Sequence, residues 1–222
     1  MRILALSDTE LKRIHSDTLS ARYADVDLLI SCGDLSHAYL EFVMTALNRT
    51  LYYVDGNHRS ESELSSERSG INLHGQCVRG PAGVLIAGIQ GSGWYNGGTG
   101  QYNQSEMWSM VLQLVPRLLS NKATLGRFLD IFVTHAPPWG IHDREDLPHQ
   151  GIKAFRWFDR NFRPRLHLHG HVHLYHASET RITDYYKTTI INCYGFQDIQ
   201  TSFPHLRFWQ KPQFGRKYGR KK

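Results

Sequence analysis

Residues 26–58 read VDLLISCGDLSHAYLEFVMTALNRTLYYVDGNH, with two short apolar runs on either side of a helical pattern. The runs, Val26–Ser31 and Leu51–Val54, have the length and the apolar composition of buried strands. Between them, residues 38–48 repeat apolar side chains three and four positions apart, which is typical of an amphipathic helix. A strand, a helix and a second strand in this order form a crossover between parallel strands. The stretch therefore predicts an α/β fold with a parallel sheet.

Each strand of this unit ends in polar residues, and the same arrangement recurs outward along the chain. Five apolar runs are followed by the polar groups Asp8, Asp34, Asn57-His58, His135 and His171-Val172-His173. Because the carboxyl ends of parallel strands meet at one edge of a sheet, we expect these side chains to converge. Carboxylate, amide and imidazole groups are ligands of divalent metals. The sequence therefore predicts a metal site at this edge.

The remaining pattern predicts further elements of the same kinds. Ile71–Val78 and Val84–Ile89 are predicted strands joined by a tight turn at 79–83. Ser105–Ser120 is a predicted helix with Ser105 as its N-cap and a kink or break at Pro116. A second helix is predicted over Ile152–Phe162. Late strands are expected at Thr188–Asn192 and His205–Trp209.

In their order along the chain, these motifs resemble those of the calcineurin-like metallophosphoesterases, a superfamily of dinuclear metal phosphoesterases. The matching motifs are Ser7-Asp8-Thr9, Gly33-Asp34, Gly56-Asn57-His58, Thr134-His135-Ala136-Pro137-Pro138 and Gly170-His171-Val172-His173. The resemblance extends from Asp8 to about Asn192. It implies an α/β fold in which two mixed β-sheets pack face to face, with helices on the outer faces (four layers, αββα).

The resemblance also implies two divalent metal ions, with Mn²⁺ favoured and Fe, Zn, Mg or Ni as alternatives. Asp8 and His173 would bind one ion, Asn57, His135 and His171 the other, and Asp34 would bridge them. His58 would stay off the metals and, with a pKa near 6.5, protonate the leaving group. Two such cations clamp phosphoryl oxygens and lower the pKa of bound water to about 7. The implied reaction is hydrolysis of a phosphomonoester or phosphodiester by metal-bound hydroxide, with His58 and Asp34 as catalytic residues.

Two positions depart from the family pattern. Glu10 stands where the family usually has a histidine ligand. It could bind metal through its carboxylate, turn away and leave the first site weakened, or be a first-turn carboxylate of a helix. We favour ligation, which would tilt the site toward Mn²⁺ or Mg²⁺, because residues 8 and 10 share a face if strand geometry continues. Arg59, where an acid is common, could bind a phosphate oxygen or form a surface ion pair, and the ion pair is slightly favoured.

Other residues are candidates for binding substrate or supporting ligands. Asn57 and His58 would contact substrate, while His149, Asn192, His37 and backbone carbonyls are candidate hydrogen-bond partners of the ligating histidines. The glycine-rich loop Gly91–Gly100 carries Trp94 and Tyr95, which could stack on a base or could cover the edge of the core. A small nucleotide-like substrate is favoured because the chain is short and shows no further substrate domain.

Composition limits the class of protein. The chain has 222 residues with 26 Lys+Arg, 20 Asp+Glu and 13 His. The segment Lys211–Lys222 holds six of the basic residues and no acid, so residues 1–210 are formally neutral, which excludes a globally basic nucleic-acid-binding domain. No apolar run reaches the ~18–20 residues of a membrane span, and the three cysteines form no disulfide framework. We expect a cytoplasmic metallophosphoesterase domain over 1–210, followed by a flexible basic tail over 211–222.

Two alternative functions remain open. A noncatalytic scaffold of the same fold could bind protein partners, and the departure at Glu10 keeps this alternative. A nuclease could be recruited to nucleic acid through the tail Lys211–Lys222. The favoured partner is a small phosphate ester. A membrane is not expected as a partner, and nucleic acid is possible through the tail but not favoured. The sequence does not give the oligomeric state.

Overall fold

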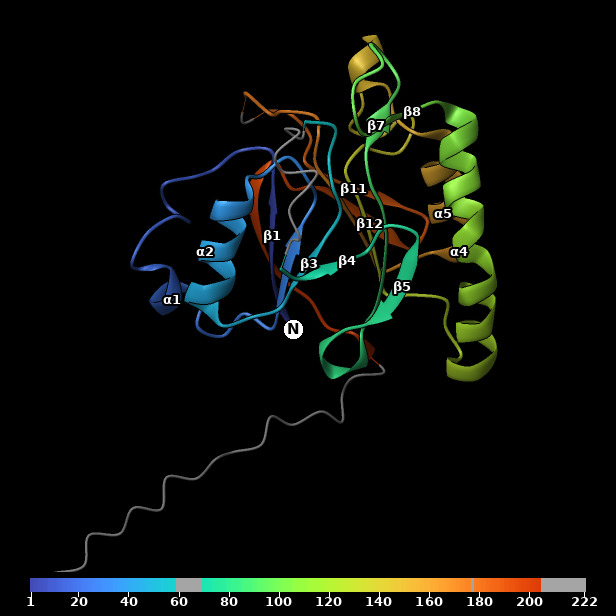
Figure 1. Cartoon of the computed structure of the whole chain (residues 1–222). Coiled ribbons are helices and arrows are strands. Elements are labelled where there is room, and N and C mark those ends of the chain that lie inside the picture. The colour runs from blue at the N-terminus through green and yellow to red at the C-terminus, as the bar shows by residue number, and fades with distance from the viewer. Residues whose placement is uncertain (59–68, 177, 205–222) are drawn as a thin grey trace, which may run out of the picture.

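Two β-sheets form the centre of the computed structural model, which describes residues 1–58, 69–176 and 178–204 (Figure 1). The first sheet has the strand order β13-β1-β2-β3-β4, and the second has the order β11-β12-β10-β9-β6-β5. A further pair, β7-β8, stands apart from both. The strands are β1 (Arg2–Ser7), β2 (Leu28–Ser31), β3 (Leu51–Tyr53), β4 (Ile71–Asn72), β5 (Gln76–Arg79), β6 (Leu85–Ile89), β7 (Ser92–Gly93), β8 (Gln101–Tyr102), β9 (Ile131–Thr134), β10 (Leu166–His169), β11 (Ile182–Tyr185), β12 (Thr188–Asn192) and β13 (Gly195–Gln200).

Both sheets are parallel at the centre and antiparallel toward an edge. Strands β1, β2 and β3 run parallel, and β13 pairs with β1 in the antiparallel direction. In the second sheet, β6, β9, β10 and β12 run parallel, while β5 and β11 are antiparallel edge strands. The sheets are therefore mixed, as expected.

Helices cover the outer face of each sheet. Figure 1 shows α1 and α2 beside the first sheet, and α4 and α5 on the opposite side of the molecule beside the second. The helical elements are α1 (Leu19–Arg22), α2 (His37–Leu47), α4 (Gln104–Leu125), α5 (Lys153–Phe162) and the 3₁₀ turns η1 (Pro81–Gly83) and η2 (Leu147–His149). The predicted four-layer α/β architecture is confirmed. None of the helices in the described ranges is long and apolar enough to cross a membrane.

Residue alternation along the strands explains the layers. In β1, Ile3 and Ala5 belong to the core between the two sheets, whereas Leu4 and Leu6 belong to the core under α1 and α2. Successive side chains of a strand point to opposite faces, so a run that is apolar at every position serves two cores at once. The same holds in β9, where Phe132 stacks on Phe158 of α5 at 4.1 Å between ring centroids, on the outer face of the second sheet.

The structure corrects three details of the sequence prediction. Ile71–Val78 is not one strand, because a turn at Gly75 (φ 66°) separates β4 from β5, which join different sheets. The long helix α4 starts from Asn103 instead of Ser105, since Asn103 and Glu106 form a capping box. Pro116 lies inside α4 without ending it. The predicted strand His205–Trp209 and the tail lie outside the described residues, so the division at residue 210 stays a prediction.

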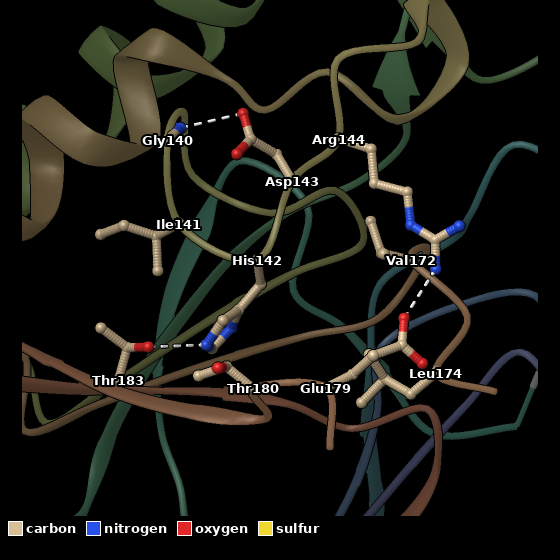
Figure 2. Close-up of a pocket in the computed structure, with 10 residues that line it drawn as sticks. All are labelled: Gly140, Ile141, His142, Asp143, Arg144, Val172, Leu174, Glu179, Thr180 and Thr183. Carbon is tan, nitrogen blue, oxygen red and sulfur yellow. Dashed lines mark hydrogen bonds and ion pairs between the residues drawn. The ribbon is translucent and has the colours of Figure 1, made fainter. Parts of the chain in front are cut away.

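A chain of hydrogen bonds accommodates a buried histidine of β10. His169 Nδ1 donates to the Gly170 carbonyl at 3.0 Å, so Nε2 of the neutral ring accepts from His142 Nδ1 at 2.9 Å. His142 Nε2 in turn accepts from Thr183 Oγ1 at 2.9 Å (Figure 2). In this arrangement both rings are neutral and every donor meets an acceptor. Consistent with this, burial lowers the pKa of His142 to about 4 and lowers the pKa of His169 well below its ordinary value.

Replacing Leu118 by alanine should lower the free energy of unfolding by about 2–5 kcal/mol, because a fully buried side chain leaves a cavity. The adjacent Leu119→Ala is a matched control, since Leu119 is 54% exposed and its loss should cost less than about 0.5 kcal/mol. Urea denaturation of both variants measures the difference. Equal losses at the two positions would contradict the assignment of the buried face of α4.

Protonation of His142 should destabilise the fold at acid pH. The unfolded side chain takes up a proton near pH 6.5, whereas the folded side chain does so only near pH 4. The free energy of unfolding therefore falls as pH decreases through this window. In His142→Gln, this dependence should be less steep by up to one proton, measured by urea denaturation with a chelator present. If the free energy of unfolding depends on pH equally in the variant and the wild type, the two histidine rings are not both neutral in the folded protein.

Candidate functional site

The candidate site lies where the carboxyl ends of strands from both sheets meet. Each predicted polar residue directly follows a strand of the structure or comes within a few residues of its end. The first sheet contributes Asp8 after β1, Asp34 after β2 and Asn57 after β3, and the second contributes His135 after β9 and His171 after β10. The convergence expected from the sequence thus arises from the parallel strands of both sheets together.

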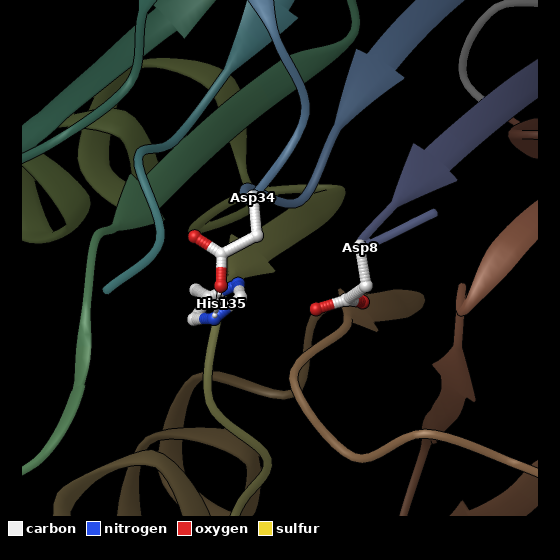
Figure 3. A group of neighbouring side chains, drawn as sticks. All are labelled: Asp8, Asp34 and His135. Carbon is white, nitrogen blue, oxygen red and sulfur yellow. Dashed lines mark ion pairs between the residues drawn. The ribbon is translucent and has the colours of Figure 1, made fainter. Parts of the chain in front are cut away.

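Asp8, Asp34 and His135 form the centre of the site (Figure 3). One ligand atom from each of the three side chains lies within 4.8 Å of the other two. Figure 3 shows the Asp34 carboxylate directed at the His135 ring, with the Asp8 carboxylate beside them. Two carboxylates and an imidazole at this spacing are a donor set for a divalent cation.

The backbone bends sharply to bring these groups together. Asp8, Asp34 and His171 all adopt left-handed conformations, with φ of 65°, 55° and 68°. Non-glycine residues rarely do so, and such residues cluster at functional sites. The neighbouring glycines leave room for the carboxylates: a Cβ on Gly56 would lie 1.9 Å from Asp34 Oδ1, and one on Gly170 would lie 2.5 Å from Asp8 Oδ2. The glycines of the motifs are therefore required by close packing.

His135 is fully buried, and its hydrogen bonds decide what can occupy the site. Its Nδ1 donates to the Cys32 carbonyl at 2.8 Å, so a neutral ring carries its lone pair on Nε2. That nitrogen faces two further lone-pair donors, Asn57 Oδ1 at 3.0 Å and Asp34 Oδ2 at 3.1 Å. Either a proton or a metal cation must lie among the three atoms to make their approach favourable. The residues present therefore fit a divalent cation by the chemistry of their donors.

The charges of the site are strongly coupled. Burial lowers the pKa of His135, but the Asp34 carboxylate outweighs burial and raises that pKa to about 9. For Asp34, burial raises the pKa, whereas His135 and the His58 backbone amide, which donates to Oδ1 at 3.0 Å, hold it well below its usual range. Burial raises the pKa of Asp8. Without a cation, the site thus holds a proton on His135.

His171 is held in a complementary tautomer. Its Nε2 donates to the Pro148 carbonyl at 2.7 Å, so Nδ1 carries the lone pair. Its backbone amide donates to both oxygens of Asp8 at 3.0 Å. The ring centroid lies 4.9 Å from that of His135, and burial lowers the His171 pKa to about 3. A neutral imidazole beside His135 and Asp8 is suited to binding a metal.

The loop after His171 is fixed by an ion pair. Arg144 donates to the His173 carbonyl at 2.7 Å and to Glu179 at 3.0 Å (Figure 2). Glu179 in turn accepts from the backbone amides of Tyr175 and His176. Arg144 and Glu179 also line a cavity of about 410 Å³ next to this loop. The His173 ring stacks on Tyr194 at 4.6 Å, and its role as a ligand stays a prediction.

The geometric premise for Glu10 as a ligand is wrong. Strand β1 ends at Ser7 and Asp8 has a positive φ, so residues 8 and 10 do not share a strand face. Glu10 is exposed, and its carboxylate accepts a hydrogen bond from Ser36, the N-cap of α2. Metal ligation by Glu10 stays a prediction without that support. Arg59 lies outside the described residues.

The two buried histidines predicted as ligands, His135 and His171, donate to backbone carbonyls, while His149 and Asn192 have other contacts. His149 pairs with Asp146, and its ring centroid lies 5.3 Å from that of His171. Asn192 donates to the Val172 carbonyl at 2.8 Å and so holds the backbone between the two histidines. The sequence gives no signal for which carbonyl a ring will face.

The glycine-rich loop reaches the site through one of its aromatic residues. The Tyr95 hydroxyl accepts a hydrogen bond from Asn57 Nδ2 at 3.1 Å, while Trp94 is 55% exposed. His58 is exposed beside Asn57. Sequence reasoning proposed stacking for Tyr95 and missed its contact with Asn57.

Comparison with known proteins bears on the family. Residues 1–175 match the family model described as calcineurin-like phosphoesterase. The solved structure of TT1561 from Thermus thermophilus superposes with a TM-score of 0.57 at 16% identity, covering 87% of this chain and 89% of that one. The phosphopantetheinyl hydrolase PptH from Mycobacterium tuberculosis gives a TM-score of 0.46 at 14% identity, covering 95% and 93%. No curated protein matches the sequence. Because the family model spans most of its length, the chain belongs to the calcineurin-like phosphoesterase family.

Proposed function

We propose that the protein is a metal-dependent hydrolase of small phosphate esters, with nucleotide-like phosphomonoesters or phosphodiesters as its favoured substrates. Membership of the calcineurin-like phosphoesterase family supports a phosphoesterase-type function. The observation that carries the proposal is the convergence of His135 Nε2, Asp34 Oδ2 and Asn57 Oδ1, with Asp8 beside them. Such a buried set of lone pairs is satisfied by a cation.

We propose that Asp8, Asp34, Asn57, His135, His171 and His173 hold two divalent cations, with Mn²⁺ favoured. When bound, these cations would neutralise the charge of the phosphoryl oxygens and supply a hydroxide nucleophile at neutral pH. The carbonyls of Cys32 and Pro148 keep the two buried imidazoles in tautomers that present a lone pair. Asn57 adds a neutral oxygen, which limits the negative charge that an incoming phosphate meets.

His58 is proposed to protonate the leaving group. Its backbone amide is anchored on Asp34, while its side chain is exposed and therefore accessible to a bound ester. An imidazole can donate a proton near neutral pH, and positioned general acids typically contribute ~10²–10⁴-fold to a rate. One histidine is thus exposed and available for proton transfer, whereas those around the carboxylates are buried.

Trp94 is the residue proposed to contact a nucleobase. It stands in the same loop as Tyr95, which touches Asn57, and more than half of its side chain is exposed. Exposed aromatic rings bind bases by stacking. This placement supports a nucleotide-like substrate over a small ester without a ring.

His58→Ala should lower kcat by ~10²–10⁴-fold for an alkyl phosphodiester in the presence of Mn²⁺. The loss should be smaller for bis(4-nitrophenyl) phosphate, because nitrophenolate leaves without being protonated. Steady-state hydrolysis of both esters measures the difference, with the exposed His176→Ala as a control of unchanged rate. Equal losses on the two esters would contradict the general-acid role. No Mn²⁺-dependent turnover in the wild type would favour the noncatalytic scaffold.

Trp94→Ala should raise KM for a nucleotide ester about 5- to 150-fold, which corresponds to the loss of one stacking contact of ~1–3 kcal/mol. The KM for an alkyl phosphomonoester, which has no aromatic ring to stack, should change much less. Initial-rate measurements on both substrates give the comparison. Proportional changes in the two KM values would argue against stacking and against the nucleotide preference.

A further inference from the structure

We propose that Tyr95 is a positioning residue that keeps the carbonyl oxygen of Asn57 directed at the cation site. The inference rests on the metal-binding role of Asn57 in the proposed function. It gives the glycine-rich loop a task in metal binding that is separate from any contact with substrate.

The two ends of the Asn57 amide have different surroundings. Oδ1 lies 3.0 Å from His135 Nε2, whereas Nδ2 donates to the Tyr95 hydroxyl at 3.1 Å. The side chain is only 6% exposed, so water cannot readily replace a lost partner. An amide that binds a cation through oxygen must point its N–H groups away, and a buried donor without an acceptor is costly. The hydroxyl oxygen of Tyr95 supplies that acceptor.

Without this acceptor, a competing orientation becomes favourable. The oxygen and nitrogen of an amide are similar in size, so rotation exchanges them without steric cost. A rotated Asn57 would direct Nδ2 toward the Asp34 carboxylate and, once His135 has given up its proton, toward the lone pair of His135 Nε2. The amide would then occupy the same lone pairs that a cation needs. Loss of the hydroxyl should therefore weaken binding of the cation.

The position of the Tyr95 hydroxyl is fixed by the loop itself. Gln101 Oε1 accepts hydrogen bonds from the backbone amide of Tyr95 at 3.1 Å and from the next two amides at 3.0 and 3.2 Å. Strands β7 and β8 pair in parallel at the base of the loop. A segment held by its own side chain and backbone does not need a ligand to order it.

The loop is also joined directly to the motif that carries Asn57. The Gly91 amide donates to the Asp55 carbonyl at 2.9 Å. A Cβ on Gly100 would lie only 2.5 Å from the Gly56 carbonyl oxygen, so the two backbones are in close contact. The Tyr95 hydroxyl is therefore placed relative to Asn57 by short connections on both sides of the loop.

Tyr102, in β8 directly after the same loop, provides a matched control. Its hydroxyl accepts from Gln90 Nε2 at 2.8 Å, a bond of the same kind to an amide that is no predicted ligand. Its ring packs against the core under α4. Tyr95→Phe and Tyr102→Phe each remove one hydroxyl and one amide hydrogen bond, but only the first touches Asn57.

The test is calorimetric titration of Mn²⁺ into the full chain after removal of metals by a chelator. Tyr95→Phe should raise the Kd for Mn²⁺ roughly 10- to 100-fold, the range found when the partner of a ligand is removed. Tyr102→Phe should leave the Kd unchanged. Thermal unfolding without metal should change by the same small amount in the two variants, which separates positioning from a loss of structure.

A second comparison, made in an Asn57→Asp variant, tests whether the orientation of the amide is responsible. In Asn57→Asp, both side-chain oxygens can face the cation and no N–H needs an acceptor. Adding Tyr95→Phe to this variant should therefore change the Kd for Mn²⁺ far less than it does in the wild type. A simple structural effect of the loop would act equally in both backgrounds.

The inference is overturned if Tyr95→Phe binds Mn²⁺ as tightly as the wild type, if Tyr102→Phe loses as much, or if the loss persists with Asn57→Asp. Failure of the proposed function gives a different result. A wild type that binds Mn²⁺ but hydrolyses no ester rejects the activity and leaves the comparison of Kd values decisive for Tyr95. A wild type that binds no Mn²⁺ rejects both.

Discussion

The hydrogen bond from His135 Nδ1 to the Cys32 carbonyl is the interaction on which the candidate site depends. Cys32 follows a strand of the first sheet and His135 follows a strand of the second, so the bond joins the two sheets beneath the site. It also fixes the tautomer of a ring that no water reaches. With Nδ1 committed, only Nε2 is left to face Asp34 and Asn57. This one hydrogen bond therefore determines both where the site lies and which ring nitrogen it offers.

Backbone carbonyls set the chemistry of two other buried imidazoles in the same way. The Pro148 carbonyl accepts from His171, and the Gly170 carbonyl accepts from His169. A carbonyl can only accept, so each one dictates which ring nitrogen keeps its lone pair. For His169 the lone pair meets another histidine and remains structural, whereas for His135 it meets two side-chain oxygens. The neighbours of the lone pair therefore distinguish the structural His169 from the candidate ligand His135.

Much of the fold and the convergence of the site could be predicted from sequence because both depend on periodicity and on strand ends. Asp34 and His135 come together because each follows a parallel strand, in two sheets that pack face to face. Details that depend on tertiary contacts could not be predicted. Glu10 leaves the strand face because Asp8 turns the backbone into a left-handed conformation, which no local pattern signals. The contact of Tyr95 with Asn57 joins residues 38 positions apart and depends on how a glycine-rich loop folds back.

The proton on His135 and a divalent cation are alternatives for the same group of lone pairs. Burial opposes any net charge at Asp8, Asp34 and His135, and the negative carboxylates are what favour keeping His135 protonated. A divalent cation would satisfy the same oxygens and free the imidazole to bind as a neutral ligand, so metal binding would release the proton. Exchange of one positive charge for two would make the site more positive. A body whose acids and bases otherwise balance would then present its local excess of positive charge where a phosphate arrives.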